Sequence, residues 1–424
     1  MKVEGTVRVP GDKSITHRAL LLGALARGRS HVGGALTSLD ARSSARVLRA
    51  LGAEVSPLRA AEIVTVRGVG KLRRPDRILD CGNSGTTARL LLGLLAGHTF
   101  EATLTGDSSL RRRPMRRVTV PLGEMGARFE ERSGDGLPLT VRGGSLHPLR
   151  YAMPVSSAQI KSSLLLAGVA GNVDVDLREP GGRSRDHTER MLRHFGFEVG
   201  ERDGWISLRP GARITPFDLQ VPGDPSSAAF MIGAAVLAEA GHLRIARVGV
   251  NPTRTGFLTV LERMGAQVAV EDPVEHFGEP VADLVAGPAE LRGTEVVAAE
   301  VPGLIDEIPM LAVLASRARG TTVFREVGEL RVKESDRLGL IAENIRAVGG
   351  VAEVQGDDLH VSGGDAPPRG RVRTAGDHRL AMAFAVLGTV PGARIHIDDL
   401  ACAAVSFPGF PDALRAVIGR GRAA

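Results

Sequence analysis

Short polar motifs stand immediately before apolar helix-like runs in this chain, and their residue types suit the binding of anions. Free backbone N–H groups and the positive end of the helix dipole make a helix start a site for phosphate or carboxylate. For any single motif, simple capping by Ser, Asn or Asp is the plainer interpretation, but capping does not explain Lys, Arg or Gln there. The six motifs are Asp12-Lys13-Ser14, Asn83-Ser84-Gly85-Thr86, Ser156-Ser157-Ala158-Gln159, Asp224-Pro225-Ser226-Ser227, Asp306-Glu307 and Asp377-His378-Arg379.

Basic residues also fill the loops that precede a second series of helices. An arginine run is by itself usually a solvated face. Together with the lysines and arginines of the helix starts, it predicts a clamp for a substrate with several negative groups, because guanidinium forks meet carboxylate or phosphate bidentately. These loops contain Arg111-Arg112-Arg113, Ser184-Arg185 and Arg331-Val332-Lys333-Glu334-Ser335-Asp336-Arg337.

Two carboxylates, Asp306 and Glu334, lie within this positive charge. They would repel an anionic ligand unless they had chemical work, so we expect general acid and base roles, with a lysine nearby. Glu307 follows Asp306 one helical step round, and we interpret it as a charge at a helix N-terminus.

Lysine is scarce here: only five of the 54 basic residues are lysine. A retained lysine indicates a place that needs a compact ammonium instead of a rigid guanidinium. Two lysines lie in the polar motifs, and Lys2 and Lys71 read as surface residues. The five are Lys2, Lys13, Lys71, Lys161 and Lys333.

The motifs recur because the chain is a duplication. Val9-Pro10-Gly11-Asp12 reappears as Val221-Pro222-Gly223-Asp224, and apolar helices end in glycine roughly every 70 to 80 residues. This period predicts six units, each a strand, a helix, a strand, a second helix and one or two strands. Two domains of three units follow, one over residues 12–221 and one over residues 1–11 plus 222–424, with hinges near the repeated Val-Pro-Gly.

Helices apolar on nearly every side predict an inside-out α/β barrel in each domain, with the helices buried and the sheets outside. The sequence predicts helices over about Ser14–Ala26, Asp40–Leu51, Thr87–Leu95 and Ser163–Val169, and a strand over Ile63–Val66.

Composition limits the class of protein. Hydrophobic residues make up 43% and charged residues 24%, as in soluble globular proteins. No run of about 18 apolar residues and no signal-peptide pattern are present, so we expect a cytoplasmic protein. Cys81 and Cys402 form neither a disulfide framework nor a metal cluster and are predicted to be core residues. The net charge of +6 is spread along the chain, with one Trp and one Tyr for base stacking, which favours small anions over nucleic acid.

Five ordered motifs resemble those of the 5-enolpyruvylshikimate-3-phosphate synthases, and the similarity runs from about Val3 to Pro411. It implies transfer of the enolpyruvyl group of phosphoenolpyruvate to the 5-hydroxyl of shikimate 3-phosphate, releasing phosphate, in aromatic amino-acid synthesis. It also implies two three-repeat domains that close over the substrates, with no metal or organic cofactor. The motifs are Gly11-Asp12-Lys13-Ser14-Ile15-Thr16-His17-Arg18, Asn83-Ser84-Gly85-Thr86, Gly106-Asp107-Ser108-Ser109-Leu110 through Arg113-Pro114-Met115, Arg331-Val332-Lys333-Glu334-Ser335-Asp336-Arg337, and Gly376-Asp377-His378-Arg379.

The resemblance implies a role for each matched residue. Shikimate 3-phosphate would be bound by Lys13, Ser14, Arg18, Ser157, Ala158, Gln159, Asp306 and Lys333. Phosphoenolpyruvate would be bound by Lys13, Gly85, Arg113, Gln159, Arg337 and Arg379. Asp306, Glu334 and Lys13 would be catalytic, Asp306 accepting the hydroxyl proton and Glu334 handling the methylene proton. The sequence does not settle which group moves which proton.

One departure from the family and two alternatives remain open. Many members have a lysine where this chain has Val405, which predicts one cation fewer around phosphoenolpyruvate. UDP-N-acetylglucosamine enolpyruvyl transferase shares the fold but uses a loop cysteine, and the loop around Arg111-Arg112-Arg113 has none. A nucleic-acid-binding protein related to terminal-phosphate cyclases is the alternative from another class. A monomer is the default expectation.

Overall fold

The computed structural model describes residues 1–131 and 134–419, which form two compact units. The N-terminal unit comprises Gly11–Val221 and His276–Glu279. The C-terminal unit comprises Met1–Pro10, Pro222–Glu275 and Pro280–Ala424. The sequence analysis assigned residues 276–279 to the C-terminal domain. The structure instead packs these four residues with the N-terminal unit.

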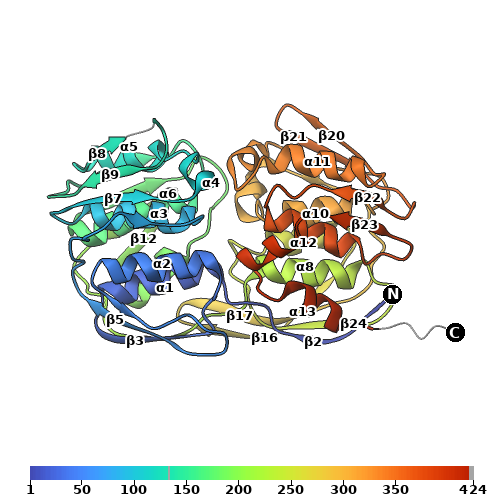
Figure 1. The fold of residues 1–424 in the computed structure, drawn as a ribbon, viewed down its shortest axis with the longest axis horizontal. Coiled ribbons are helices and arrows are strands. Elements are labelled where there is room, and N and C mark those ends of the chain that lie inside the picture. Colours follow the sequence, from blue (N-terminus) through green and yellow to red (C-terminus); the bar gives the residue numbers. More distant parts are fainter. Residues whose placement is uncertain (132–133, 420–424) are drawn as a thin grey trace. The chain divides into compact units, whose positions relative to one another are not determined.

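The N-terminal unit alternates helices and short strands (Figure 1). Its helices are α1 (Lys13–Leu25), α2 (Leu39–Ala50), α3 (Gly85–Ala96), α4 (Ser108–Arg111), α5 (Arg116–Glu124), α6 (Ala158–Gly171) and α7 (His187–His194). Its strands are β3 (Arg27–Gly33), β4 (Glu54–Val55), β5 (Val64–Val69), β6 (Leu79–Asp80), β7 (Glu101–Thr105), β8 (Arg128–Glu131), β9 (Leu139–Arg142), β10 (Leu149–Ala152), β11 (Val175–Arg178), β12 (Glu198–Arg202), β13 (Trp205–Arg209) and β14 (Asp218–Gln220).

These strands form four-stranded sheets with one shared pattern. The orders are β14-β3-β5-β4, β6-β7-β9-β8 and β10-β11-β13-β12. In each sheet the first two strands are parallel, and the remaining two add antiparallel neighbours. A parallel pair needs a crossover connection, which α3 supplies between β6 and β7 and α6 between β10 and β11.

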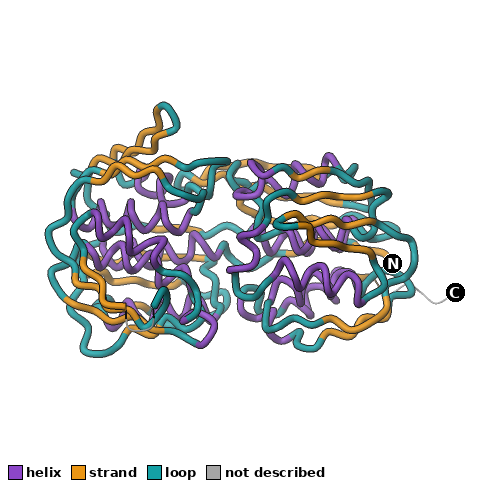
Figure 2. Tube along the Cα trace, turned by 90° about the horizontal axis from the view of Figure 1, so that it is seen from above, coloured by secondary structure: helices purple, strands orange, loops and turns teal. Residues whose placement is uncertain are grey.

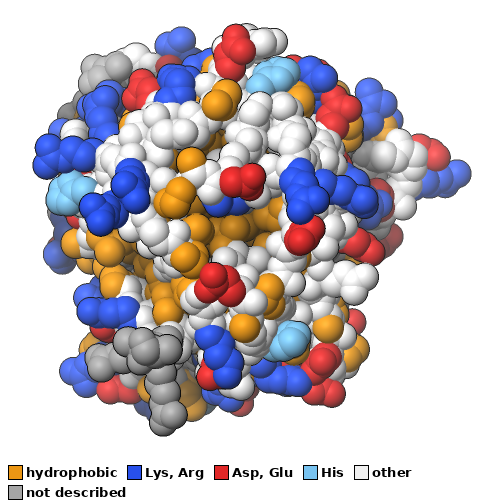
Figure 3. All heavy atoms as spheres, turned by 90° about the vertical axis from the view of Figure 1, so that its right-hand side faces the viewer, with side chains coloured by type: hydrophobic (Ala, Val, Ile, Leu, Met, Phe, Trp, Pro, Cys, Tyr) orange, Lys and Arg blue, Asp and Glu red, His pale blue; other side chains and the backbone are white. Residues whose placement is uncertain are grey.

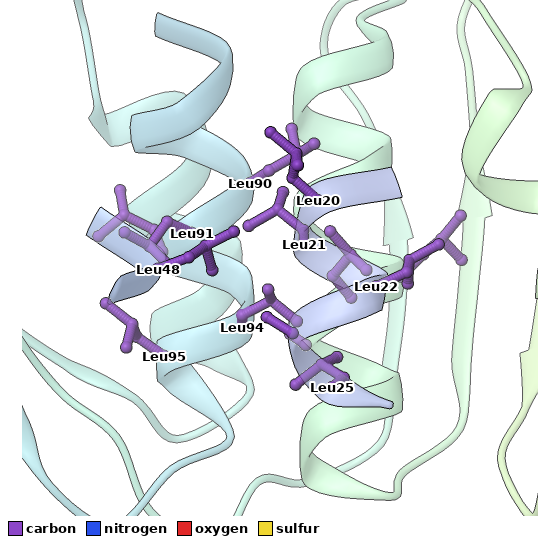
Figure 4. Close-up of a cluster of buried hydrophobic side chains, with 14 of the residues drawn as sticks. Leu20, Leu21, Leu22, Leu25, Leu48, Leu90, Leu91, Leu94 and Leu95 are labelled. Atoms are coloured by element: carbon purple, nitrogen blue, oxygen red, sulfur yellow. The ribbon is translucent and has the colours of Figure 1, made fainter. Parts of the chain in front are cut away.

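The helices are the core of this unit. Leucines on α1, α2 and α3 point toward one another in Figure 4, and Leu20, Leu21 and Leu90 have no exposed surface. Helices α3 and α6 approach closely because Gly93 has no side chain: a Cβ there would collide with the carbonyl oxygen of Ser163. The helices predicted near residues 14–26, 40–51, 87–95 and 163–169 are present, with the last beginning earlier, at Ala158.

The C-terminal unit uses the same kinds of element. Its helices are α8 (Pro225–Val236), α9 (Gly256–Arg263), α10 (Ile308–Ala315), α11 (Arg337–Ala347), α12 (His378–Leu387) and α13 (Phe410–Val417), with 3-10 turns η1 (Ala298–Gly303), η2 (Gly328–Val332) and η3 (Ala401–Val405). Its strands are β1 (Lys2–Val3), β2 (Gly5–Val7), β15 (Leu243–Gly249), β16 (Val268–His276), β17 (Glu279–Ala286), β18 (Glu295–Val296), β19 (Thr321–Phe324), β20 (Val351–Gln355), β21 (Asp358–Ser362), β22 (Arg369–Val372), β23 (Arg394–Ile397) and β24 (Ile418–Gly419).

The sheets of the C-terminal unit depend on both ends of the chain. β2 begins the sheet β2-β15-β17-β16, and β1 pairs with β24. The order β18-β19-β21-β20 repeats the pattern of the N-terminal unit, and β22 and β23 form a parallel pair. Helices α8, α10 and α12 are buried along nearly their whole lengths. Figure 2 shows helices inside this unit with strands around them.

The turn between β16 and β17 packs on the N-terminal unit. The Phe277 ring lies among those of His194, Phe195 and Phe217. Glu279 Oε1 lies 2.8 Å from His187 Nδ1, with both side chains at most 3% exposed. Aromatic burial and this pair explain why the turn belongs to the N-terminal unit.

The surface drawn in Figure 3 carries basic and acidic side chains intermixed around a hollow lined by apolar side chains. A face that binds nucleic acid would instead show a continuous basic stripe. Within residues 1–131 and 134–419, no helix is both long and apolar enough to cross a membrane. Cys81 is buried as predicted, whereas Cys402 is only half-buried, so the prediction of a core position is wrong for Cys402.

Candidate active site

The polar motifs do open helices, as predicted. Asp12, Ser84 and Ser157 are the N-caps of α1, α3 and α6 in the N-terminal unit. In the C-terminal unit the N-caps of α8, α10 and α12 are Asp224, Glu307 and Asp377. The Ser157 side chain makes no capping bond, which leaves the start of α6 with N–H groups that a ligand oxygen could use.

Lys13 lies in the first turn of α1 and faces a carboxylate that sequence analysis did not identify. Its Nζ lies 3.3 Å from Asp40 Oδ2 on α2, and both side chains are largely buried. On the next residue, the Ser14 hydroxyl accepts a hydrogen bond from Arg185 Nη1 at 3.3 Å. Two cations therefore stand at the start of α1.

Arg18 is buried one turn further along α1. Its guanidinium donates to Thr188 Oγ1 at 2.7 Å, Ser162 Oγ at 2.6 Å and the Ser14 carbonyl oxygen at 2.9 Å. Burial lowers the pKa of Arg18 to about 10. The hydroxyls come from α6 and α7, so three helices fix this one guanidinium.

Gln159 and Gly85 lie where α6 and α3 begin. Arg89 donates a short hydrogen bond to Gln159 Oε1, and Gln159 Nε2 donates to Thr86 Oγ1 at 3.0 Å. Gly85 faces another arginine, because a Cβ at this glycine would lie 3.1 Å from Arg113 Nη1. Asn83 holds that arginine by accepting from Arg113 Nη2 at 2.8 Å.

The structure thus brings together most of the predicted residues of the N-terminal unit. The hydrogen bonds link the starts of α1, α3 and α6 through Arg18, Gln159 and neighbouring hydroxyls. We call this set the cationic cluster: Lys13, Ser14, Arg18, Gly85, Arg89, Arg113, Ser157, Ala158, Gln159 and Arg185.

A second set lies in the C-terminal unit and contains carboxylates. Asp306 is surrounded by basic groups, with Arg337 Nη1 at 3.3 Å, Arg379 Nη2 at 3.8 Å and Lys333 Nζ at 3.9 Å from its oxygens. Arg379 also donates to the Asp306 carbonyl oxygen at 3.0 Å. We call this set the carboxylate cluster: Asp306, Lys333, Glu334, Arg337, Asp377 and Arg379.

Arg337 is the centre of the carboxylate cluster. It is fully buried and lies 2.5 Å from Glu334 Oε2 and 2.7 Å from Asp377 Oδ2. Burial alone would lower the pKa of Arg337, but Asp377, Glu334 and Asp306 outweigh it and raise the pKa. Burial likewise would raise the pKa of Asp377, and Arg337 outweighs it, so that this pKa is lowered.

Glu307 lies at the start of a helix, as interpreted from the sequence, because it is the N-cap of α10. Its side chain is 2% exposed, accepts a short hydrogen bond from Ser226 Oγ, and lies 3.7 Å from Arg254 Nη2. Arg254 also lies 3.3 Å from Asp224, the cap of α8. Glu307 therefore ties α10 to α8 instead of facing solvent. The adjacent Asp306 points to different partners.

The sequence missed residues whose partners are distant along the chain. Asp40 and Arg89 lie in helices, where nothing local marks them. Lys161 was visible as a rare lysine but had no assigned role. Val405, where many relatives have lysine, lies half-buried in η3. The described residues hold no cluster of three or more His, Cys, Asp or Glu side chains that could bind a metal ion.

Comparison with known proteins identifies the class. The family model of EPSP synthase (3-phosphoshikimate 1-carboxyvinyltransferase) matches residues 1–414. The 3-phosphoshikimate 1-carboxyvinyltransferase of Alkalilimnicola ehrlichii is 48% identical over 411 residues, which cover 96% of this chain and 92% of the relative. The enzyme of the same name from Gluconobacter oxydans is 47% identical over 425 residues, covering 98% and 95%.

Solved structures agree with the sequence comparison. The EPSP synthase of Acinetobacter baumannii has a TM-score of 0.86 at 38% identity and covers 98% of this chain and 96% of its own. The enolpyruvyl transferase NikO from Streptomyces tendae, at 20% identity and a TM-score of 0.79, shares the fold.

The fold is thus the α/β fold of enolpyruvyl transferases. Within that class, the chain belongs to the EPSP synthase family. Its activity is that of the family, the transfer of an enolpyruvyl group from phosphoenolpyruvate to shikimate 3-phosphate in the shikimate pathway.

Proposed function

We propose that the cationic cluster and the carboxylate cluster carry out the enolpyruvyl transfer together. In this proposal Lys13, Ser14, Arg18, Ser157, Ala158 and Gln159 bind shikimate 3-phosphate with Asp306 and Lys333. Phosphoenolpyruvate is bound by Lys13, Gly85, Arg113, Gln159, Arg337 and Arg379. The observation that carries the proposal is the difference in charge: the N-terminal unit offers cations, hydroxyls and N–H groups, and the C-terminal unit adds carboxylates held by cations.

The reaction needs both kinds of group. The 5-hydroxyl oxygen of shikimate 3-phosphate bonds to C2 of phosphoenolpyruvate while its proton passes to a base and another proton is delivered to C3. The tetrahedral intermediate then loses phosphate from C2 and a proton from C3, which restores the double bond. We assign the first base to Asp306 and proton transfer at C3 to Glu334, with Lys13 stabilising negative charge.

The geometry supports these assignments in two ways. Asp306 and Glu334 both contact Arg337, which holds the two carboxylates close together. Lys333 Nζ lies near Asp306, which provides a cation beside the proposed proton acceptor. A pair of titratable groups with a shared arginine allows proton transfer at two points of one substrate pair.

The repeated sheet order supports a finer proposal about the fold. We infer six related units, three in each of two domains, arranged as inside-out barrels with buried helices. The order parallel, antiparallel, antiparallel occurs in the sheets that begin with β6, β10, β14 and β18, and the sheet that begins with β2 starts with the same parallel and antiparallel pairs. For the sixth unit, β22 and β23 supply the parallel pair, and β1 with β24 supplies the antiparallel pair. We further propose that the protein is a monomer, that it acts in the cytoplasm, and that its substrates are small molecules.

Phosphate release from phosphoenolpyruvate, measured with and without shikimate 3-phosphate, tests the function. We expect release only when shikimate 3-phosphate is present, with formation of 5-enolpyruvylshikimate 3-phosphate. Release that requires UDP-N-acetylglucosamine would support the related transferase. No release with either acceptor would contradict enolpyruvyl transfer.

A further inference from the structure

Lys161 has an environment that the roles proposed so far do not use. It lies on α6, three residues after Ala158, and its side chain is 1% exposed. Its ammonium lies 2.9 Å from Glu189 Oε1, 3.0 Å from Glu179 Oε2 and 3.1 Å from the Ser184 carbonyl oxygen. An ammonium has three donors, and all three have an acceptor here.

Two of these acceptors lie in the loop that carries Arg185 of the cationic cluster. Glu179 is the first residue of this loop from β11 to α7, Ser184 lies near its end, and the adjacent glycines Gly181 and Gly182 lie between them. Glu179 Oε2 also accepts from Ser184 N at 3.2 Å, so the lysine and the carboxylate close the loop on itself. Arg185, which donates to the Ser14 hydroxyl, is the next residue.

The third acceptor, Glu189, lies next to a residue that holds Arg18. Glu189 follows Thr188 on α7, and Ser162 follows Lys161 on α6. Thr188 and Ser162 are the two hydroxyls that receive the Arg18 guanidinium, and Thr188 donates to Ser162 at 2.8 Å. The ion pair between Lys161 and Glu189 thus sits beside the hydroxyl pair that fixes Arg18.

We infer that Lys161 is a positioning residue for the binding of shikimate 3-phosphate. By joining α6, α7 and the loop before α7, its ammonium sets the places of Arg18 and Arg185 at the start of α1. The inference rests on the proposed function, because it concerns the residues proposed to hold the phosphate of that substrate.

A chemical role for Lys161 itself does not fit its surroundings. Burial would lower its pKa, but Glu189 and Glu179 outweigh burial and raise it, so the amine stays protonated. A protonated ammonium with three acceptors cannot act as a base or a nucleophile. Glu179 and Glu189 together carry one more negative charge than the Lys161 ammonium neutralises. The positive charge of the nearby Arg18 offsets it.

Two substitutions test the inference at different strengths. Glu179→Gln keeps the shape and leaves the ion pair with Glu189, so the protein should fold with a weaker loop. Lys161→Met removes all three bonds. Because hydrogen bonds to charged groups are among the stronger ones, we expect the KM for shikimate 3-phosphate to rise roughly tenfold in Glu179→Gln and further in Lys161→Met. The KM for phosphoenolpyruvate and kcat should change less than about threefold.

Lys71→Met is the matched control, because Lys71 is an exposed lysine of the same unit. Thermal unfolding establishes that each variant is folded, and Glu179→Gln decides the matter if Lys161→Met does not fold. Unchanged KM for shikimate 3-phosphate in the folded variants, or an equal rise for both substrates, would overturn the positioning role.

Calorimetric titration with shikimate 3-phosphate distinguishes a failure of the Lys161 inference from a failure of the proposed reaction. Binding that weakens in Glu179→Gln supports Lys161 even if the wild type releases no phosphate. Turnover by the wild type together with unaltered binding in both variants would remove the inference and leave the reaction intact.

Discussion

Two buried arginines, one in each unit, are held in opposite ways. Arg18 donates to two hydroxyls and a carbonyl oxygen, and burial lowers its pKa to about 10. Arg337 is surrounded by Asp377, Glu334 and Asp306, which raise its pKa. The hydrogen-bond partners of Arg18 are neutral, and the carboxylates of Glu189, Asp12 and Glu279 act on its charge only from beyond these contacts. The charge of Arg337 already holds protein carboxylates in place.

We propose that this difference reflects a division of work between the two clusters. A site for binding an anion benefits from cationic groups that a ligand can contact, whereas a site for proton transfer needs carboxylates at fixed positions. In the proposed reaction the cationic cluster, in which Lys13 is itself paired with Asp40, has the first task and the carboxylate cluster the second. Substitutions at five residues test this division.

Glu334→Gln should have the largest effect. The amide keeps the shape but cannot exchange a proton at C3, so we expect kcat to fall by about 100- to 10,000-fold with little change in substrate binding. Single-turnover kinetics and substrate titration measure the two separately. A rise in KM with kcat intact would place Glu334 in binding and remove the contrast between the units.

Arg337→Met should destabilise the folded protein by about 3–5 kcal/mol at neutral pH, because buried carboxylates lose their partner. Arg331→Met, at a partly exposed arginine with surface ion pairs, is the control and should change stability by less than about 1 kcal/mol.

The pH dependence of Arg337→Met follows from Asp377. Its pKa is lowered in the folded state, so its pair with Arg337 contributes stability above the unfolded pKa and loses it as pH falls through the folded pKa. The difference in unfolding free energy between wild type and Arg337→Met should therefore become smaller at acid pH. Denaturant titration at several pH values measures this difference. A difference that does not change with pH would show that the buried carboxylates are not the cause of the destabilisation.

Lys13→Arg sharpens the comparison within the cationic cluster. It keeps the charge but changes the size and donor geometry beside Asp40, and each lost charge-assisted bond should cost roughly 1.5–3 kcal/mol of transition-state stabilisation. Steady-state kcat/KM reports the loss, with Lys71→Arg as the control at an exposed lysine. Near-normal turnover would show that any cation suffices at this position.

His17 tests the N-terminal unit at low pH. Burial, together with Lys13 and Arg18, lowers its pKa from 6.5 to about 3. The unfolded state therefore binds the additional proton, and this group should remove about 1.4 kcal/mol of stability per pH unit below about 6.5 until its folded pKa is reached. His17→Gln should flatten that slope in acid titrations of stability. A slope equal to that of the wild type would contradict the neutral, buried state of His17.

Gly85→Ala should have the smallest effect. The new methyl would lie 3.1 Å from Arg113 Nη1, at the flexible end of a side chain that can shift. The resemblance implies sensitivity to glyphosate, a longer molecule than phosphoenolpyruvate, so we expect weaker inhibition with a smaller loss of phosphoenolpyruvate binding. Competition kinetics decide this, with Gly123→Ala, which adds a methyl into open space, as control. Equal losses of affinity for glyphosate and phosphoenolpyruvate, or a wild-type enzyme that glyphosate does not inhibit, would show that the space beside Gly85 does not limit inhibitor binding.

Local features were predictable from the sequence. The starts of α1, α3, α8 and α12 were found because capping residues act on N–H groups two or three positions away. The apolar runs of α3 and α6 likewise predicted that these helices are buried. The same local rule placed Glu307 at the start of α10, but nothing nearby in the sequence indicates its partners Ser226 and Arg254.

Pairings between distant residues could not be found in this way. Lys13 and Asp40 are 27 positions apart, and Lys161 and Glu179 are 18 apart. No spacing rule links them, because the sheets and crossovers decide which helices become neighbours. The scarcity of lysine drew attention to Lys161, and only the packing of α6 against α7 gave it partners.

The turn between β16 and β17 bears on whether the two halves of the polypeptide are self-sufficient. A fragment cut at residues 11 and 221 would lack Phe277 and Glu279, so the rings of His194, Phe195 and Phe217 would lose a neighbour and His187 its acceptor. The N-terminal unit is therefore not encoded by one uninterrupted stretch. Four residues supplied from the later half complete it, and a gene split at the duplication boundary would yield two pieces of which neither is whole.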